Sequence, residues 1–236
     1  MKTLDDFPPH TKIPLEEIIK DIQDEGIVLD VGCADMWLAR LITSKNAEVI
    51  GIDINIISLR YGKGLISASP SLRSHAICAS VSALPIRDSS IDKVIMLEVI
   101  EHLHPLDAHK AIKEVYRSLK SYGFLMLSTP NDAGKLVNLT DPWFLLGHKH
   151  FKLSSLKKQL HRFKFNIIKA YAYGGIIEAL LVGFIVTMWH ILWKFFLKRT
   201  IHPPPPFHRT LYKIALLDSF KLGLRGTHLY LKCVKV

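Results

Sequence analysis

Two acidic residues of the sequence have the spacing of a site for an adenosine-containing ligand. Asp30 lies in the apolar run 27–31, just before Gly32, and Asp53 lies near the end of the run 48–54. The amides of such a turn and the start of the next helix can bind a carboxylate or phosphate, and glycine permits close backbone approach. An acid at the tip of the second strand can bind two ribose hydroxyls. The alternative is that both acids cap neighbouring helices.

A second set of residues could accept or donate a proton. Glu101 and His102 follow the apolar run 91–97, and His150 lies in a later segment; these residue types act as general acids and bases. The alternative for Glu101 and His102 is that they cap or pack the next helix. His148 and His150 could bind a metal ion, but no third ligand has suitable spacing, so no metal is predicted.

The candidate residues lie between segments whose patterns alternate between strand and helix. Continuous apolar runs predict strands, and helical spacing predicts helices. The predicted strands are 27–31, 48–54, 74–80, 91–97, 123–130, 165–173 and 227–236, and the predicted helices are 13–25, 35–44, 56–66, 107–119 and 154–163. This order indicates an α/β protein with a doubly wound, mostly parallel, seven-stranded Rossmann-like sheet, which binds ligands at the carboxyl ends of its strands.

A long apolar segment precedes the last predicted strand. We therefore predict a core over 1–174, a helical insert over 175–226 and a final core strand over 227–236. Residues 176–197 are long enough to cross a bilayer, but the chain must then return to the sheet through a polar helix. An interfacial helix or re-entrant hairpin fits better. The alternative is a buried dimerisation or lid helix, and no oligomeric state is predicted.

The positive charge of the chain is concentrated in its last third. The net charge is +10, and residues 146–236 hold 16 of the 31 basic residues but only 2 of the 21 acidic ones. This predicts an anionic partner: a membrane surface, a phosphorylated substrate or a nucleic acid. The alternative is a solvated basic face. The first ten residues have no apolar signal core, and the three cysteines have no metal or disulfide spacing, which indicates the reducing cytosol.

Three longer stretches carry a family resemblance. "ALPIRDSSIDKVIMLEVIEHL" (83–103) and "EVYRSLKSYGFLMLSTPN" (114–131) resemble the class I S-adenosylmethionine-dependent methyltransferases. The closest similarity is to the branch that modifies small molecules, quinones and lipid or sugar intermediates. The stretch "GHKHFKLSSLKKQLHRFKFNIIKAYAYG" (147–174) also resembles that branch. A nicotinamide cofactor is not expected, because residues 32–37 do not fit G-x-G-x-x-G. The resemblance implies S-adenosylmethionine as the cofactor.

The resemblance also implies roles for single residues. Asp30 and Gly32 would orient the methionine end, Asp53 would bind the ribose, Ile54 would pack on the adenine, Ser80 and Val81 would edge the adenine, and Leu97 and Glu98 would line the pocket near the methionine. The sequence departs from the family at Ala34 and Met36, where the family has glycine, and at Ser80, where it often has aspartate. We therefore expect a working site with reshaped cofactor contacts.

The expected function combines these observations. It is methyl transfer from S-adenosylmethionine to a hydrophobic or lipid-linked small-molecule acceptor, by a protein held peripherally or monotopically on the cytoplasmic face of an anionic membrane. One alternative is a non-catalytic binding protein, suggested by the altered glycine turn. The other is an RNA methyltransferase that uses the basic third, but the apolar insert argues against nucleic acid as a partner.

Overall fold

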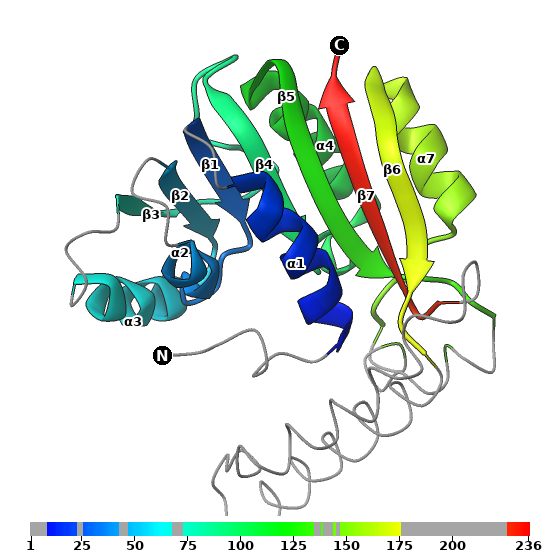
Figure 1. Cartoon of the computed structure of the whole chain (residues 1–236), viewed down its shortest axis with the longest axis horizontal. Coiled ribbons are helices and arrows are strands. Elements are labelled where there is room, and N and C mark those ends of the chain that lie inside the picture. Colours follow the sequence, from blue (N-terminus) through cyan, green and yellow to red (C-terminus); the bar gives the residue numbers. More distant parts are fainter. Residues whose placement is uncertain are drawn as a thin grey trace, which may run out of the picture.

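The computed structural model is built around one seven-stranded sheet, and it describes residues 9–22, 26–42, 47–67, 73–134, 138, 144, 147–175 and 226–236. The strands are β1 (Gly26–Val31), β2 (Ala47–Asp53), β3 (Ser74–Cys78), β4 (Ile91–Leu97), β5 (Leu119–Pro130), β6 (Phe165–Tyr173) and β7 (His228–Lys235). Their order is β3-β2-β1-β4-β5-β7-β6, and β7 alone runs opposite to the other six strands (Figure 1). This confirms the predicted fold class.

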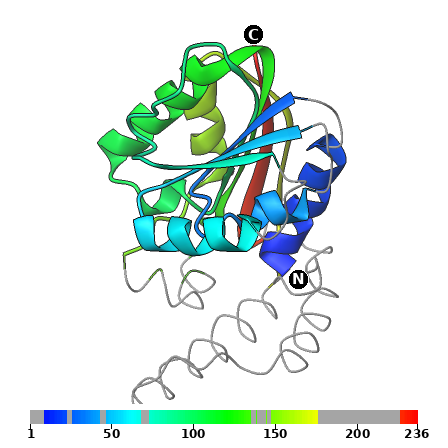
Figure 2. The ribbon, with the colours of Figure 1, turned by 90° about the vertical axis from the view of Figure 1, so that its left-hand side faces the viewer.

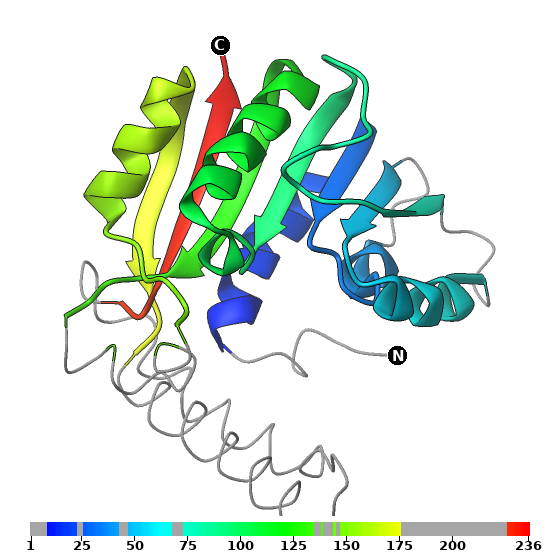
Figure 3. The same ribbon diagram turned by 180° about the vertical axis from the view of Figure 1, so that it is seen from behind.

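Helices cover both faces of the sheet. They are α1 (Pro9–Ile22), α2 (Trp37–Leu41), α3 (Ile56–Ser67), the 3-10 turn η2 (Ile100–His102), α4 (Pro105–Ser118) and α7 (Leu153–Arg162). Helices α4 and α7 lie on one face and α1 lies on the other, as opposite views show (Figures 1 and 3). Helix α3 lies along the edge of the molecule towards which β1, β4 and β5 point (Figures 1 and 2).

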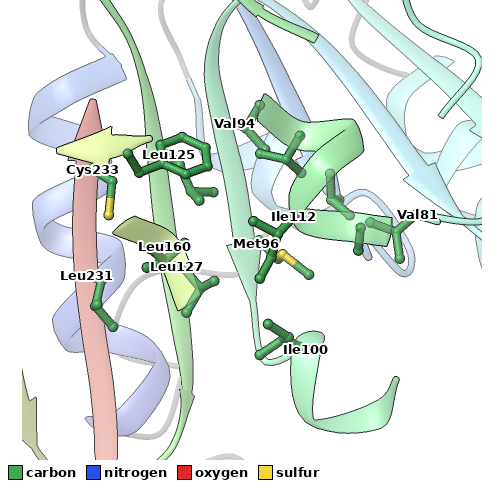
Figure 4. Close-up of a cluster of buried hydrophobic side chains, with 14 of the residues drawn as sticks. Val81, Val94, Met96, Ile100, Ile112, Leu125, Leu127, Leu160, Leu231 and Cys233 are labelled. Atoms are coloured by element: carbon green, nitrogen blue, oxygen red, sulfur yellow. The ribbon is translucent and has the colours of Figure 1, made fainter. Parts of the chain in front are cut away.

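Each face of the sheet has its own hydrophobic cluster. Ile112 of α4 and Leu160 of α7 pack with Val94 and Met96 of β4 on one face (Figure 4). Ile95, between those two β4 residues, belongs to the cluster that packs under α1 on the other face. Because both faces are buried, the central strands are continuously apolar instead of alternating.

Two predicted elements have different lengths in the structure. The helix predicted at 35–44 is reduced to α2, which begins only at Trp37, because Ala34 and Met36 have positive φ angles of 47° and 58°. An α-helix requires negative φ, so this segment forms a turn instead. Strand β5 begins at Leu119, earlier than predicted, beside a register irregularity between Ile91 and Lys93 of β4.

The chain leaves the sheet at the end of β6 and re-enters it beside that point, at the start of β7. Tyr173, at the end of β6, pairs with His228, at the start of β7, and β6 runs in the direction of β5. The points where the predicted insert joins the core therefore lie at the carboxyl-end edge of the parallel strands. Residues 176–225 of the predicted insert 175–226 fall outside the described residues. Among the residues that are described, no helix has the length and apolarity needed to cross a membrane.

Candidate functional site

The turn after β1 is held against the end of β2 by its own backbone. The amides of Gly32 and Cys33 both donate hydrogen bonds to the carbonyl oxygen of Ile52, at 2.7 and 3.1 Å. Gly32 has a φ of +74°, and a Cβ at this position would lie 2.3 Å from Cγ2 of Val99. Both the backbone conformation and the space therefore require glycine here.

Ala34 and Met36 occupy the two positions at which the resemblance implies glycine. Their positive φ angles explain that preference, since L-residues with a side chain adopt this conformation at a cost. Met36 is buried, and a Cβ built on Gly51 would lie 2.3 Å from its Sδ atom. The Met36 side chain therefore fills the space above Gly51 in β2, and neither Ala34 nor Met36 lines the cavity that contains Asp53.

Asp53 ends β2 with both carboxylate oxygens oriented by backbone amides. Its Oδ2 accepts a hydrogen bond from the amide of Ala34 at 2.9 Å, and its Oδ1 accepts one from the amide of Asn55 at 2.8 Å. A carboxylate has further lone pairs, so it can still accept hydrogen bonds from two hydroxyl groups. The geometry is suited to a ribose.

Asp30 lies in β1 and is buried, with 5% of its surface exposed. Burial, followed by the charge of the nearby Asp53, raises the pKa of the Asp30 carboxyl to about 7. The charge of Asp30 is therefore sensitive to pH near neutrality, and a cationic group bound nearby would favour its ionised form.

A cavity of about 340 Å³ lies at the carboxyl ends of β1, β2 and β4. It is lined by Gly32, Ile52, Asp53, Ile54, Ala79, Ser80, Val81, Glu98, Val99, His102 and Leu103. These residues fit the predicted cofactor. Gly32 presents bare backbone at a position with no room for a Cβ, Asp53 offers a carboxylate, and Ile54 and Val81 offer apolar surface. Ser80 donates or accepts a hydrogen bond with the hydroxyl of Ser82 at 2.8 Å, which orients this rim of the cavity.

A polar cluster centred on two carboxyl groups lies at the wall of the cavity, with Glu98 partly buried and Glu101 buried. Glu98, which has a φ of 53°, accepts a hydrogen bond from Ser128 Oγ at 2.6 Å, and Glu101 accepts one from Thr129 Oγ1 at 3.0 Å. Burial, and then the charge of Glu98, raise the pKa of Glu101 well above its usual value. Glu98 and Glu101 also share a hydrogen bond. Since a carboxylate only accepts hydrogen bonds, this contact favours the protonated form of Glu101 and acts in the same direction on its pKa.

The histidines separate into those at the cavity and one away from it. His102 lines the cavity, and its ring lies edge-on to that of His148, with centroids 4.2 Å apart. Burial, and then His148, lower the pKa of His102, so its imidazole is neutral near pH 7. His150 lies instead beside Phe144, at 4.8 Å between ring centroids. No group of three or more metal-ligating side chains occurs in the part of the chain that the structure describes.

The cavity brings together some of the predicted site residues and not others. Asp30, Leu97, Glu101 and His150 are not among the residues that line it, and Leu97 packs on the cluster under α1. Three further residues of the site, Ser128, Thr129 and His228, were not predicted from the sequence. Nε2 of His228 lies 3.9 Å from Oε2 of Glu98. The first two end β5 and the third begins β7, so a tip-of-strand argument applied to "LSTPN" could have found Ser128 and Thr129.

Comparison with known proteins agrees with this geometry. Residues 29–127 match the family model described as a methyltransferase domain. A probable S-adenosylmethionine-dependent methyltransferase of Mycobacterium tuberculosis is 35% identical over 104 residues, covering 44% of this chain and 35% of the relative. A ubiquinone biosynthesis O-methyltransferase of Paracidovorax citrulli is 31% identical over 137 residues, covering 53% of this chain and 56% of that protein. The chain thus spans only part of the length of these relatives.

Solved structures share the fold at lower sequence identity. The crystal structure of the [4+2]-cyclase SpnF has a TM-score of 0.64 and 18% identity, over 95% of this chain and 80% of that one. At this identity the likeness describes the architecture alone. Residues 29–127 thus match a methyltransferase domain, the sequence relatives include S-adenosylmethionine-dependent methyltransferases, and S-adenosylmethionine is the cofactor that these similarities imply.

Proposed function

We propose that the protein transfers a methyl group from S-adenosylmethionine to a hydrophobic or lipid-linked acceptor at the cytoplasmic face of an anionic membrane. The observation that carries the catalytic part is the arrangement of Glu98 and His102. Both line the cavity beside Asp53, and Glu98 is linked to the buried Glu101. A non-catalytic binding protein would need the cavity but not a histidine with a lowered pKa and two neighbouring carboxyl groups at its wall.

The residues at the cavity divide the chemistry between binding and proton transfer. When bound, S-adenosylmethionine supplies an electrophilic methyl group on its sulfonium. Asp53 and Gly32 position the ligand, and such alignment provides much of the rate in a displacement of this kind. Neutral His102 accepts the proton of a hydroxyl or amine acceptor as its oxygen or nitrogen gains the methyl group. Glu98, kept in place by Ser128, orients the acceptor at the same wall.

The membrane part of the proposal rests on the sequence and on where the insert is attached. The apolar segment 176–197 and the 16 basic residues within 146–236 suit an interfacial helix on anionic lipid. The attachment points beside Tyr173 and His228 lie at the carboxyl-end edge that also holds the cavity. A hydrophobic acceptor in the lipid would then be close to the methyl donor. A relative named for O-methylation in ubiquinone biosynthesis supports an acceptor of this kind.

A label-transfer experiment tests the proposal. Full-length protein is incubated with S-adenosylmethionine labelled on its methyl group and with vesicles made from a total lipid extract. We expect label in the organic phase, and we expect His102→Gln to lower the rate about 10²-fold or more. The affinity of His102→Gln for the cofactor, measured by calorimetry, should change little, because the ligand is positioned mainly by Asp53 and Gly32.

Two results would contradict the proposal. Tight cofactor binding without transfer of label to any extract would identify a non-catalytic binding protein. Transfer of label to RNA but not to the lipid extract would identify the basic third as a nucleic-acid-binding region.

A further inference from the structure

The outward side of α3 carries an apolar stripe that no described part of the chain covers. Ile57 is 77% exposed, Tyr61 64% and Leu65 39%, and these residues follow each other at four-residue spacing along one side of the helix. Ile56 is exposed beside them. The opposite side of the helix packs against the rest of the protein, since Leu59 is buried and a Cβ on Gly62 would lie 2.2 Å from the carbonyl oxygen of Asp35.

The helix is also fixed at its start, so the stripe has a defined orientation. Oδ1 of Asn55 accepts hydrogen bonds from the amides of Ile57 and Ser58, at 3.0 and 3.2 Å, and so caps α3. Ile54, which lines the cavity, lies just before this cap and is itself highly exposed. The stripe therefore begins at the rim of the cavity.

The charge on α3 itself is positive. Helix α3 has no acidic residue, and Arg60 lies on its exposed side next to the stripe. The absence of acidic residues from α3 is unusual for this part of the chain, because residues 1–145 hold 19 of the 21 acidic residues. Exposed apolar side chains interleaved with basic ones are typical of a helix that lies in the headgroup layer of an anionic membrane.

A second copy of the chain is a weaker candidate for the occupant. A stable protein interface buries about 800 Å² on each partner, contributed by about 20–30 residues. Four apolar side chains on a single helix do not supply such an area. A lipid surface needs no matching shape, only apolar area and positive charge.

We propose that the outward side of α3, formed by Ile56, Ile57, Arg60, Tyr61 and Leu65, contacts an anionic lipid surface and turns the rim of the cavity towards it. This proposal rests on the membrane location proposed above and assigns a second contact to it, independent of the insert. Helix α3 and the points where the insert joins the sheet lie along the same edge of the molecule (Figures 1 and 2). The two contacts would hold that edge against the lipid.

Sedimentation with vesicles tests the contact. Full-length protein is mixed with vesicles of phosphatidylcholine and phosphatidylglycerol in equal amounts, and the partition coefficient is measured for Ile57→Ser/Tyr61→Ser. The matched control is Tyr122→Ser/Ile168→Ser, which removes side chains that are 76% and 55% exposed in β5 and β6. We expect the α3 variant to bind about tenfold more weakly and the control to stay within about twofold of the wild type. Arg60→Gln should weaken binding about fivefold at low salt.

The outcomes separate this inference from the proposed function. If the wild type binds and the α3 variant binds as well as the control, the α3 contact is wrong while the membrane location stands. If the wild type does not bind the vesicles, the proposed membrane location and the α3 contact are both wrong. If the wild type is a dimer in size-exclusion chromatography with light scattering and the α3 variant is a monomer, the stripe is a subunit interface and the lipid contact is overturned.

Discussion

The buried carboxyl of Asp30 makes folding of this protein sensitive to pH. Its pKa is about 7 in the folded protein and near 3.8 when unfolded. Between these values the native state binds more protons, so the free energy of unfolding falls as the pH rises from about 4 to 7. The full cost, about 4 kcal/mol, is present above pH 7 and absent below pH 4.

Asp30→Asn should remove this dependence. We expect the difference in unfolding free energy between pH 5 and pH 8, measured by chemical denaturation, to be smaller in the variant. Glu101, whose pKa is raised in the same direction, is present in both proteins, so the comparison isolates Asp30. An unchanged difference would mean that Asp30 keeps an ordinary pKa.

Asp53 should contribute directly to cofactor binding. Asp53→Ala removes the carboxylate that lines the cavity, and we expect S-adenosylmethionine affinity to fall by about 1–3 kcal/mol, the scale for a charged hydrogen-bond partner. Asp35→Ala is the control: Asp35 lies in the same turn but pairs with Arg40 and does not line the cavity. Equal effects of the two substitutions in calorimetry would disprove the ribose assignment.

Met36 and Gly51 should be energetically coupled, because one fills the space that the other leaves. Gly51→Ala places a Cβ 2.3 Å from Met36 Sδ and 2.8 Å from Cys33 Sγ, and we expect it to lower the free energy of unfolding by about 1–3 kcal/mol. The same substitution should cost less in a Met36→Ala background. Additive effects in this double-mutant cycle would show that the contact is not formed.

At the scale of elements, the predicted strands were confirmed, whereas the helix predicted at 35–44 is shorter and begins later. Buried parallel strands leave a strong apolar signal in the sequence, and Asp53 and Gly32 follow from their position at strand ends. The short α2 depends on left-handed dihedrals at Ala34 and Met36, residue types that give no local signal for that conformation. Ser128 meets Glu98 because β5 pairs with β4, whereas His228 reaches Glu98 only because β7 inserts between β5 and β6, which no local pattern reveals.

The sheet should close without the insert. Tyr173 and His228 pair directly, and β7 pairs with both β5 and β6 along its length. We therefore expect replacement of 175–226 by a short Gly-Ser turn to leave a folded protein that binds the cofactor with little change in affinity. The measurements are circular dichroism, thermal unfolding and calorimetry. Loss of cooperative unfolding would show that the insert is part of the core and not an appended element.

At the scale of the whole molecule, the cavity and the two attachment points of the insert share one edge of the sheet. The proposed membrane contact then places a hydrophobic acceptor close to the sulfonium methyl group. The central claim is that this edge performs methyl transfer, and not only cofactor binding. Similarity to methyltransferases alone does not decide this, because one architecture supports different activities.

The most direct test is mass spectrometry of lipid and polar extracts incubated with S-adenosylmethionine and the full-length protein. We predict a species shifted by one CH₂ group in the lipid extract, formed by the wild type and strongly reduced with Asp53→Ala. No shifted species in either extract, under conditions where calorimetry shows the cofactor bound, would contradict the claim that the protein is a methyltransferase for such an acceptor.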